Sequence, residues 1–215
     1  MNREKITIEV WSDIVCPYCY LGKRKLHQAI HRLHASDRID IIWRSYQLDP
    51  GFPENTSISS LQYLSQRKGY PVAHIRGMHQ QLSERGRRYG IRFQFETSLS
   101  FNTLDAHRLW QWSRSSGKSD ALKEAFFSAY FTDGVDLSKN ENLLEVVEMA
   151  GLDKAEAGRI LVSGAYSDAV ELDVCFARQL GIRSVPYFLI NEKKAISGAQ
   201  DDRVFEEAIS VYLSN

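Results

Sequence analysis

Apolar and polar side chains alternate near the start of the chain and then change to the spacing of a helix. Residues 6–10 place Ile or Val at every second position, which is the period of a β-strand. Between residues 26 and 33, apolar side chains recur three and four positions apart and so share one face of an α-helix. Residues 39–46 are rich in Ile and Trp and indicate a second strand. We therefore predict a βαβ unit over residues 1–47, with a right-handed crossover through the helix.

The middle of the chain has a different pattern. From residue 57 to about residue 180 the spacing is almost wholly helical, with short breaks that contain Gly, Ser or Pro. A segment of this length predicts about five or six helices. One of them follows Asn102, which we predict to be its N-cap because Asp105 then stands in the first turn, where an acid is favoured.

Strand character returns near the end of the chain. Residues 185–190 form a short apolar run, residues 191–194 have the composition of a turn, and residues 195–197 fit a paired strand. A helix is predicted to begin at Asp201 and Asp202. Its buried face is predicted to consist of Phe205, Ala208, Ile209 and Tyr212.

The order of these elements predicts the fold. A βαβ start and a ββα end, with helices between them, are typical of an α/β thioredoxin-like fold with a large all-helical insertion. We predict a discontinuous thioredoxin-like domain over residues 1–56 and 181–215, and an inserted helical domain over residues 57–180.

Composition and charge narrow the class of protein. The 215 residues include 27 basic and 27 acidic side chains, so neither nucleic acid nor an anionic membrane surface is expected as a partner. No stretch approaches the ~18 apolar residues of a membrane span. Charges at Arg3, Glu4, Lys5 and Glu9 do not fit a signal peptide, and three cysteines fit a reducing compartment. We expect a cytoplasmic protein.

The candidate chemistry lies in the segment Cys16-Pro17-Tyr18-Cys19, between the first strand and the first helix. Disulfide exchange needs a thiolate that attacks a disulfide and a second thiol that resolves the mixed disulfide. At a helix N-terminus the backbone N–H groups and the helix dipole favour a negative charge and lower the pKa of a thiol. We therefore predict that Cys16 is an exposed nucleophile with a lowered pKa and that Cys19 is the shielded resolving thiol.

Two other interpretations of the cysteine pair are weaker. A structural zinc site needs four ligands, and the third cysteine, Cys175, stands alone, so no metal site is expected. Inert core cysteines do not fit a position at an element boundary beside Pro17. Cys175 itself lies between apolar neighbours in a helical run, and we predict that it is a small buried hydrophobe.

The second half of the predicted site is Val185 and Pro186, directly before an apolar strand. In thioredoxin-like proteins a cis-proline stands opposite the dithiol, and the exposed backbone before it pairs with an extended peptide or with glutathione. We predict that Val185, Pro186 and Tyr18 contact substrate. For His107 two interpretations stay open: a cleft residue that assists proton transfer, and a histidine packed in or on its helix.

Six separated motifs carry a resemblance to a known family. They are SDIVCPYCYLG at residues 12–22, WRSYQLDP at 43–50, NTLDAHR at 102–108, FSAYF at 127–131, VPYF at 185–188 and SGAQ at 197–200. Over nearly its whole length the chain resembles the FrnE-like branch of the DsbA-like thioredoxin-fold oxidoreductases. The resemblance implies the helical insertion, a cis-proline at Pro186, and dithiol oxidoreductase or isomerase activity.

The same branch is related to 2-hydroxychromene-2-carboxylate isomerase and kappa-class glutathione transferase, which typically have Ser at the position of Cys16. Having both Cys16 and Cys19 favours a reductase or isomerase of protein or small-molecule disulfides, poised toward the reducing side. A glutathione-dependent transferase or isomerase is the alternative, and a non-enzymatic holdase is a third. Expected partners are protein or peptide disulfides, with glutathione as a candidate co-substrate and no required cofactor; the oligomeric state is left open.

Overall fold

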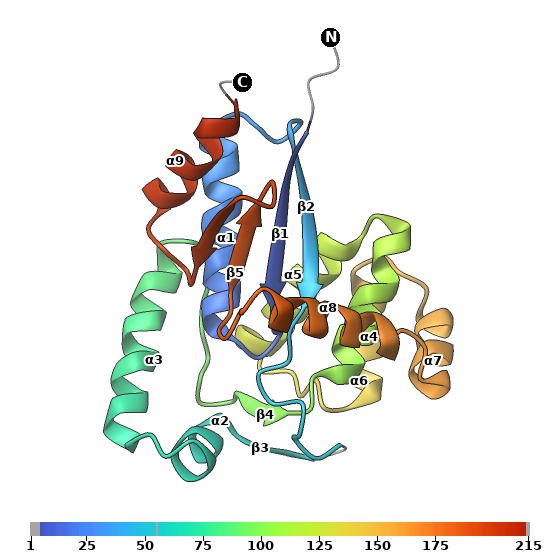
Figure 1. Cartoon of the computed structure of the whole chain (residues 1–215). Helices are drawn as coiled ribbons and strands as arrows, with labels where there is room; N and C mark the ends of the chain where they lie inside the picture. The colour runs from blue at the N-terminus through green and yellow to red at the C-terminus, as the bar shows by residue number, and fades with distance from the viewer. Residues whose placement is uncertain (1–4, 55, 214–215) are drawn as a thin grey trace. The chain divides into compact units, whose positions relative to one another are not determined.

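The computed structural model describes residues 5–54 and 56–213 (Figure 1). Arg3 and Glu4, two of the N-terminal charges discussed above, lie outside the described residues. The described residues divide into two compact units: one combines those of Met1–Leu48 with those of Leu172–Asn215, and the other comprises those of Asp49–Glu171. We call these the thioredoxin-like unit and the helical unit.

The thioredoxin-like unit is built on a four-stranded sheet with the strand order β2-β1-β5-β6. Its strands are β1 (Ile6–Ser12), β2 (Ile39–Ser45), β5 (Tyr187–Ile190) and β6 (Lys194–Ser197). The central strand β1 runs parallel to β2 and antiparallel to β5. All of its residues except Thr7 are buried, including the polar Glu9 and Ser12.

Helices α1 (Pro17–Arg32) and α9 (Asp202–Leu213) pack against each other in this unit (Figure 1). Phe188 on β5 and Phe205 on α9 are both fully buried, and their rings meet edge to face at 4.9 Å. The predicted buried face of the last helix is confirmed at Phe205, Ala208 and Ile209. Helix α8 (Ser167–Gln179) begins in the helical unit and contributes Leu172–Gln179 to the thioredoxin-like unit.

The helical unit contains helices and a small two-stranded sheet. Its elements are β3 (Ser57–Ser59), α2 (Ser60–Gln62), the π-helical turn η1 (Tyr63–Arg67), α3 (Val72–Arg87), β4 (Leu99–Phe101), α4 (Leu104–Ser113), the 3₁₀ turn η2 (Arg114–Ser116), α5 (Ser119–Phe131), α6 (Asn140–Met149) and α7 (Lys154–Ser163). Aromatic side chains fill much of its core. The fully buried Lys123 places Nζ 3.1 Å from the centroid of the Trp110 ring, which favours a cation.

The predicted α/β thioredoxin-like fold with a helical insertion is confirmed, and three details are corrected. The insertion is not all-helical, because β3 and β4 pair antiparallel within it. The units divide after residues 48 and 171, earlier than the predicted 56 and 180, and the second division falls inside α8. Helix α4 has Thr103 as its N-cap, and the Asn102 side chain accepts a hydrogen bond from the Leu104 N–H at 3.0 Å.

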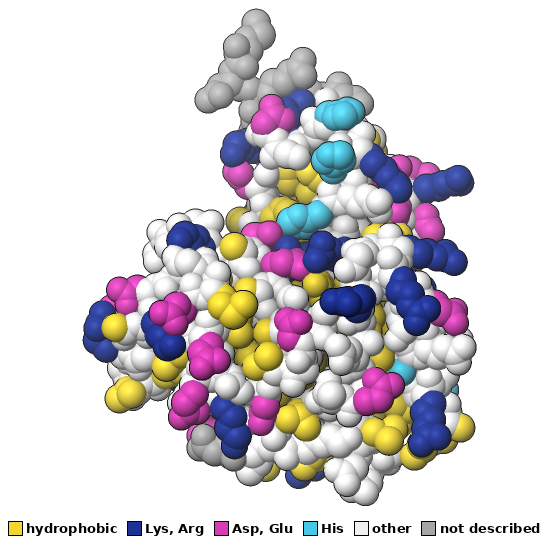
Figure 2. Space-filling view, turned by 180° about the vertical axis from the view of Figure 1, so that it is seen from behind, with side chains coloured by type: hydrophobic (Ala, Val, Ile, Leu, Met, Phe, Trp, Pro, Cys, Tyr) yellow, Lys and Arg dark blue, Asp and Glu magenta, His cyan; other side chains and the backbone are white. Residues whose placement is uncertain are grey.

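On the face shown in Figure 2, acidic and basic side chains are interspersed, in keeping with their equal numbers in the sequence. Among the described residues, no helix is both long enough and apolar enough to cross a membrane.

Candidate active site

The dithiol lies where the central strand passes into the first helix. β1 ends at Ser12, a three-residue turn follows, and Cys16 is the N-cap of α1 in an extended backbone conformation. Pro17 occupies the first helical turn, where its missing N–H is not needed. The carbonyl of Cys16 accepts hydrogen bonds from the N–H groups of Cys19 at 3.0 Å and Tyr20 at 3.3 Å. Both predicted catalytic cysteines therefore stand in one helical turn, as free thiols.

Burial of the dithiol corrects the prediction of an exposed nucleophile. Cys16 is only 5% exposed and Cys19 only 1%. The pKa of Cys16 is raised well above that of an ordinary thiol, chiefly by its hydrogen bond with the Cys19 side chain and then by burial and by the charge of Cys19. The backbone N–H of Cys19 acts in the opposite direction but does not outweigh these causes. The lowered pKa of Cys16 that was inferred from helix placement alone is therefore wrong, because that inference left out the hydrogen bond with Cys19 and the burial of the thiol.

Val185 and Pro186 lie directly beside the nucleophile. The Val185–Pro186 peptide bond is cis, and the Cys16 thiol donates to the carbonyl oxygen of Val185 at 3.7 Å. The antiparallel pairing of Trp11 with Tyr187 places the start of β5 next to the end of β1, and so brings residues far apart in sequence together. A Cβ atom on Gly22 would lie 2.9 Å from Cγ of Pro186, so this glycine lets α1 approach Pro186 closely.

Asp13 fastens the turn that leads to Cys16. Its side chain is fully buried, and its two carboxylate oxygens accept from the N–H groups of Ile14 and Leu48, each at 2.7 Å. Its carbonyl accepts from the Cys16 N–H at 3.4 Å. Asp13 therefore joins the turn after β1 to the segment that follows β2.

A dithiol at the N-terminus of the first helix, with a proline directly before β5 beside it, is the arrangement expected of thioredoxin-fold oxidoreductases. The sequence profile of the DSBA-like thioredoxin domain matches residues 7–210 of this chain. The chain belongs to the DsbA-like thioredoxin family. The profile covers the dithiol, the insertion and the strand after Pro186, so membership does not rest on the cysteine motif alone.

This DsbA-like chain is similar to a curated protein sequence and to several solved structures. The uncharacterised protein YwbO of Bacillus subtilis is 26% identical over 95% of this chain and 96% of its own. A probable DsbA oxidoreductase from Streptomyces coelicolor, SCO1869, is 30% identical, with a TM-score of 0.93 over 98% of this chain and 91% of that one.

Two more distant structures share the fold. A 2-hydroxychromene-2-carboxylate isomerase is 18% identical, with a TM-score of 0.72 over 97% of this chain and 96% of its own. The cytosolic disulfide reductase DsbM from Pseudomonas aeruginosa, solved with GSH, is 14% identical, with a TM-score of 0.65 over 97% of this chain and 100% of its own.

The remaining predicted site residues of the DsbA-like chain have different environments. Tyr18 lies in the first turn of α1 and is half-buried, while Cys175 on α8 is also half-buried rather than fully buried as predicted. His107 on α4 is completely buried in the helical unit, with its ring 5.5 Å from that of Trp110. This is the packed alternative for His107, and contact of Tyr18 with substrate stays a prediction.

Sequence reasoning missed an ionic cluster in the thioredoxin-like unit, in which two buried carboxylates share a half-buried arginine. The Arg44 guanidinium donates to Glu9 at 2.6 and 2.9 Å and to Asp173 at 2.9 Å. Burial alone would lower the pKa of Arg44, but the two carboxylates together outweigh it and raise the pKa. Asp173 also accepts from the Ser45 N–H at 2.9 Å. The cluster fastens α8 to β1 and β2. The sequence held one signal for this cluster: a charged residue, Glu9 or Arg44, stands inside each of two otherwise largely apolar strands.

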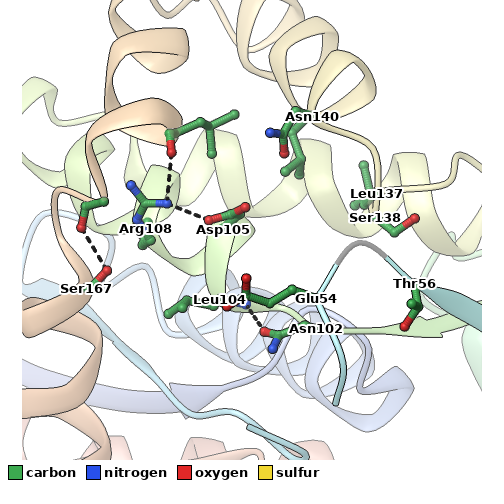
Figure 3. Close-up of a pocket in the computed structure, with 13 residues that line it drawn as sticks. Glu54, Thr56, Asn102, Leu104, Asp105, Arg108, Leu137, Ser138, Asn140 and Ser167 are labelled. Atoms are coloured by element: carbon green, nitrogen blue, oxygen red, sulfur yellow. Dashed lines mark hydrogen bonds and ion pairs between the residues drawn. The ribbon is translucent and has the colours of Figure 1, made fainter. Parts of the chain in front are cut away.

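The helical unit has a cavity of its own, of about 280 Å³ (Figure 3). Arg108 lines it and points toward Asp105, to which it donates at 2.6 Å. The same guanidinium donates to the carbonyl oxygens of Ile160, Leu161 and Ala165, at the end of α7 and just beyond it. Within residues 5–54 and 56–213, no group of three or more His, Cys, Asp or Glu side chains is placed to hold a metal ion.

Proposed function

We propose that this chain is a thiol–disulfide oxidoreductase that reduces or isomerises disulfides in proteins, peptides or small molecules. The observation that carries the proposal is the arrangement of the dithiol: Cys16 caps α1, Cys19 follows one turn later, and the Val185 carbonyl lies 3.7 Å from the Cys16 sulfur. A substrate that displaces this contact finds the attacking thiol and a free backbone carbonyl at the same place.

Each step of the exchange conserves sulfur, protons and electrons. The Cys16 thiol loses its proton to solvent, and its sulfur attacks one sulfur of the substrate disulfide, releasing the other as a thiolate that takes up a proton. Cys19 then attacks Cys16 in the mixed disulfide and releases the second substrate thiol. Two electrons have passed to the substrate, and Cys16–Cys19 is oxidised. Two molecules of an external thiol of low molecular weight then reduce Cys16–Cys19: the first forms a mixed disulfide with one cysteine, and the second releases that cysteine as the free dithiol is restored and the two leave as their own disulfide.

The state of the dithiol supports work on the reducing side. Strong oxidants of the DsbA type, near −120 mV, owe their potential to a stabilised reduced form. Here the raised pKa of Cys16 means that burial and Cys19 do not stabilise the thiolate. We propose a potential nearer to the range of about −200 to −230 mV typical of glutaredoxins, in a reducing compartment such as the cytoplasm.

Two variants and one control test this function. Cys16→Ser should reduce the rate of insulin disulfide reduction to the background of the assay, because no attacking sulfur remains. Cys19→Ser should accumulate a mixed disulfide between Cys16 and the substrate, detectable by mass spectrometry. Cys175→Ser, the matched control, should retain the parent rate. A Cys16→Ser protein with parental activity would overturn the proposal.

Glutathione is the proposed co-substrate. The fold similarity to DsbM, whose structure contains GSH, supports it as the thiol that restores the dithiol. The similarity in fold to 2-hydroxychromene-2-carboxylate isomerase favours a second candidate, a glutathione-dependent isomerase or transferase. The two differ in their dependence on Cys19. Conjugation of glutathione to a chromogenic electrophile should survive Cys19→Ser if the second candidate holds, whereas catalytic disulfide reduction should not survive it.

A further inference from the structure

The cavity of the helical unit is lined by residues that the dithiol chemistry does not use. They are Glu54 and Thr56, near the start of the unit, and members of the stretches 102–108, 137–143 and 161–167. All of them fall within Asp49–Glu171, so the cavity belongs to this unit alone. Its volume of about 280 Å³ is close to the lower end of the range of ligand pockets and suits a small organic molecule.

The cationic side chain of the lining, Arg108, is engaged by the wall of the cavity. Its side chain is only 5% exposed, and its guanidinium donates to Asp105 and to the carbonyl oxygens of three residues around the end of α7. A guanidinium has five N–H donors, so four such bonds leave it little capacity to bind an anion. A phosphate or carboxylate ligand is therefore not favoured here.

The carboxylate of Asp105 is available to the cavity. One of its oxygens accepts from Arg108 at 2.6 Å, and Figure 3 shows the other oxygen turned away from that arginine. The side chain is 41% exposed, so a molecule inside the cavity can reach this second oxygen. Glu54, which is exposed, is a second acid of the lining, and the lining carries one more negative than positive charge. These charges favour a ligand with a cationic N–H donor.

The apolar part of the lining is aliphatic. It consists of Leu104, Leu137, Leu143 and Leu161. Leu137 and Leu143 are each only 1% exposed, so they belong to the core of the unit as well as to the cavity wall. No aromatic ring is among the described residues that line the cavity, which favours a cation held by carboxylates over one held by ring faces. Leucine side chains beside a carboxylate suit an alkyl chain that ends in an ammonium group.

We propose that this cavity binds a small aliphatic amine. The ammonium group donates to the second oxygen of Asp105, the alkyl chain lies against the leucines, and Glu54 adds attraction from the exposed side. The proposal goes beyond disulfide exchange and does not depend on Cys16 or Cys19.

Calorimetric titration of the whole protein with 1,4-diaminobutane tests this. We expect saturable binding of one molecule with a Kd of about 0.1–10 mM, the range expected of so small a ligand. Two probes of the same chain length serve as controls. 1,4-Butanediol has no charge and succinate has the opposite charge, and neither should bind measurably.

A pair of matched variants locates the amine. Asp105→Asn keeps an oxygen for Arg108 but loses the charge, and it should weaken binding of 1,4-diaminobutane about tenfold, as expected when a hydrogen bond to a charged group is lost. Asp168→Asn is the control, because Asp168 is also an exposed acid in the first turn of a helix but does not line the cavity. It should bind like the parent.

Each outcome decides the proposal. No binding of 1,4-diaminobutane, equal binding of the diol, or equal affinities of Asp105→Asn and Asp168→Asn would overturn it. If Asp105→Asn does not fold, Glu54→Gln replaces it at an exposed position, and binding should weaken about two- to threefold. The amide NMR signals of Leu104 and Ser138 should also shift during the titration, and shifts confined to residues away from the cavity would contradict the site.

Discussion

In each unit of the molecule one arginine side chain donates to several partners inside the fold, and the two arginines have different partners. In the thioredoxin-like unit, Arg44 lies between the carboxylates of Glu9 and Asp173, which are 6% and 3% exposed. In the helical unit, Arg108 donates mainly to three backbone carbonyl oxygens, and its carboxylate partner Asp105 has a side chain that is 41% exposed. The Arg44 guanidinium therefore neutralises buried negative charges, whereas the Arg108 guanidinium donates to the last carbonyl groups of a helix, which lack donors within the helix.

The difference shows that each unit is stabilised internally in its own way. Arg44 on β2 reaches Asp173 on α8, 129 residues away, so the cluster fixes long-range contacts around the sheet that carries the dithiol. Arg108 on α4 links α4 to α7, because it donates to carbonyl groups at the C-terminal end of α7 that have no partner within the helix. Removing the Arg44 side chain leaves two buried negative charges without a cation. Removing the Arg108 side chain leaves neutral carbonyl groups without a donor, which costs less free energy of unfolding.

The largest effect is therefore expected at Arg44. Arg44→Met should lower the free energy of unfolding by about 3–5 kcal/mol, because Glu9 and Asp173 would remain buried without their shared cation. Urea unfolding followed by tryptophan fluorescence measures this. Arg159→Met removes an exposed ion pair instead and should leave the free energy of unfolding at the parent value within the error of the titration. Equal stability of Arg44→Met and the parent would contradict the cluster's role.

Arg108→Met should have a smaller effect. We expect a loss of about 1–3 kcal/mol in the free energy of unfolding, since the freed carbonyl oxygens are neutral and Leu161, one of the residues that carry them, lines a cavity that can admit water. The same urea titration provides the measurement. A loss larger than that of Arg44→Met would reverse the comparison between the units.

Two helical glycines are expected to respond to the same substitution in opposite directions, and the Gly77 variant gives the smallest effect. Gly22→Ala should cost about 1–3 kcal/mol and slow insulin reduction, because its Cβ would meet Pro186 at 2.9 Å beside Cys16. Gly77→Ala, in the interior of α3 with open space around the new methyl group, should instead stabilise the protein by about 0.5–1 kcal/mol. Thermal unfolding and the insulin assay on both variants test the contrast, which fails if Gly22→Ala has parental stability and activity.

The sequence predicted the elements whose pattern is local. The alternation over residues 6–10 and the helical spacing over residues 26–33 correspond to β1 and α1, since each pattern is read within one element. Strands β3 and β4 were missed because three residues are too few to show a period, and Ser57–Ser59 is largely polar. Each strand forms only by pairing with the other, and α2, η1 and α3 lie between the two in the sequence.

The sequence predicted which residues form the site but not the burial or the pKa of Cys16. The cysteine pair and the proline were identifiable because their spacing and their place between elements are visible in the sequence. Burial of Cys16 was not, since it depends on Val185, which is 169 residues away. The predicted direction of the pKa shift was wrong for the same reason: the argument included the helix N-terminus but not burial or the Cys19 hydrogen bond.

The pairing of β1 with β5 has a consequence for synthesis. Next to this pair, the Thr7 N–H donates to the Asn191 side chain across 184 residues of sequence. At about 5–20 residues per second, a ribosome needs roughly 10–40 s to travel that distance. During this interval the newly made Cys16 and Cys19 exist without Val185 and the strand that follows it. Their vulnerability to oxidation and alkylation in the cell is thus set first by the pace of translation and only later by the folded protein.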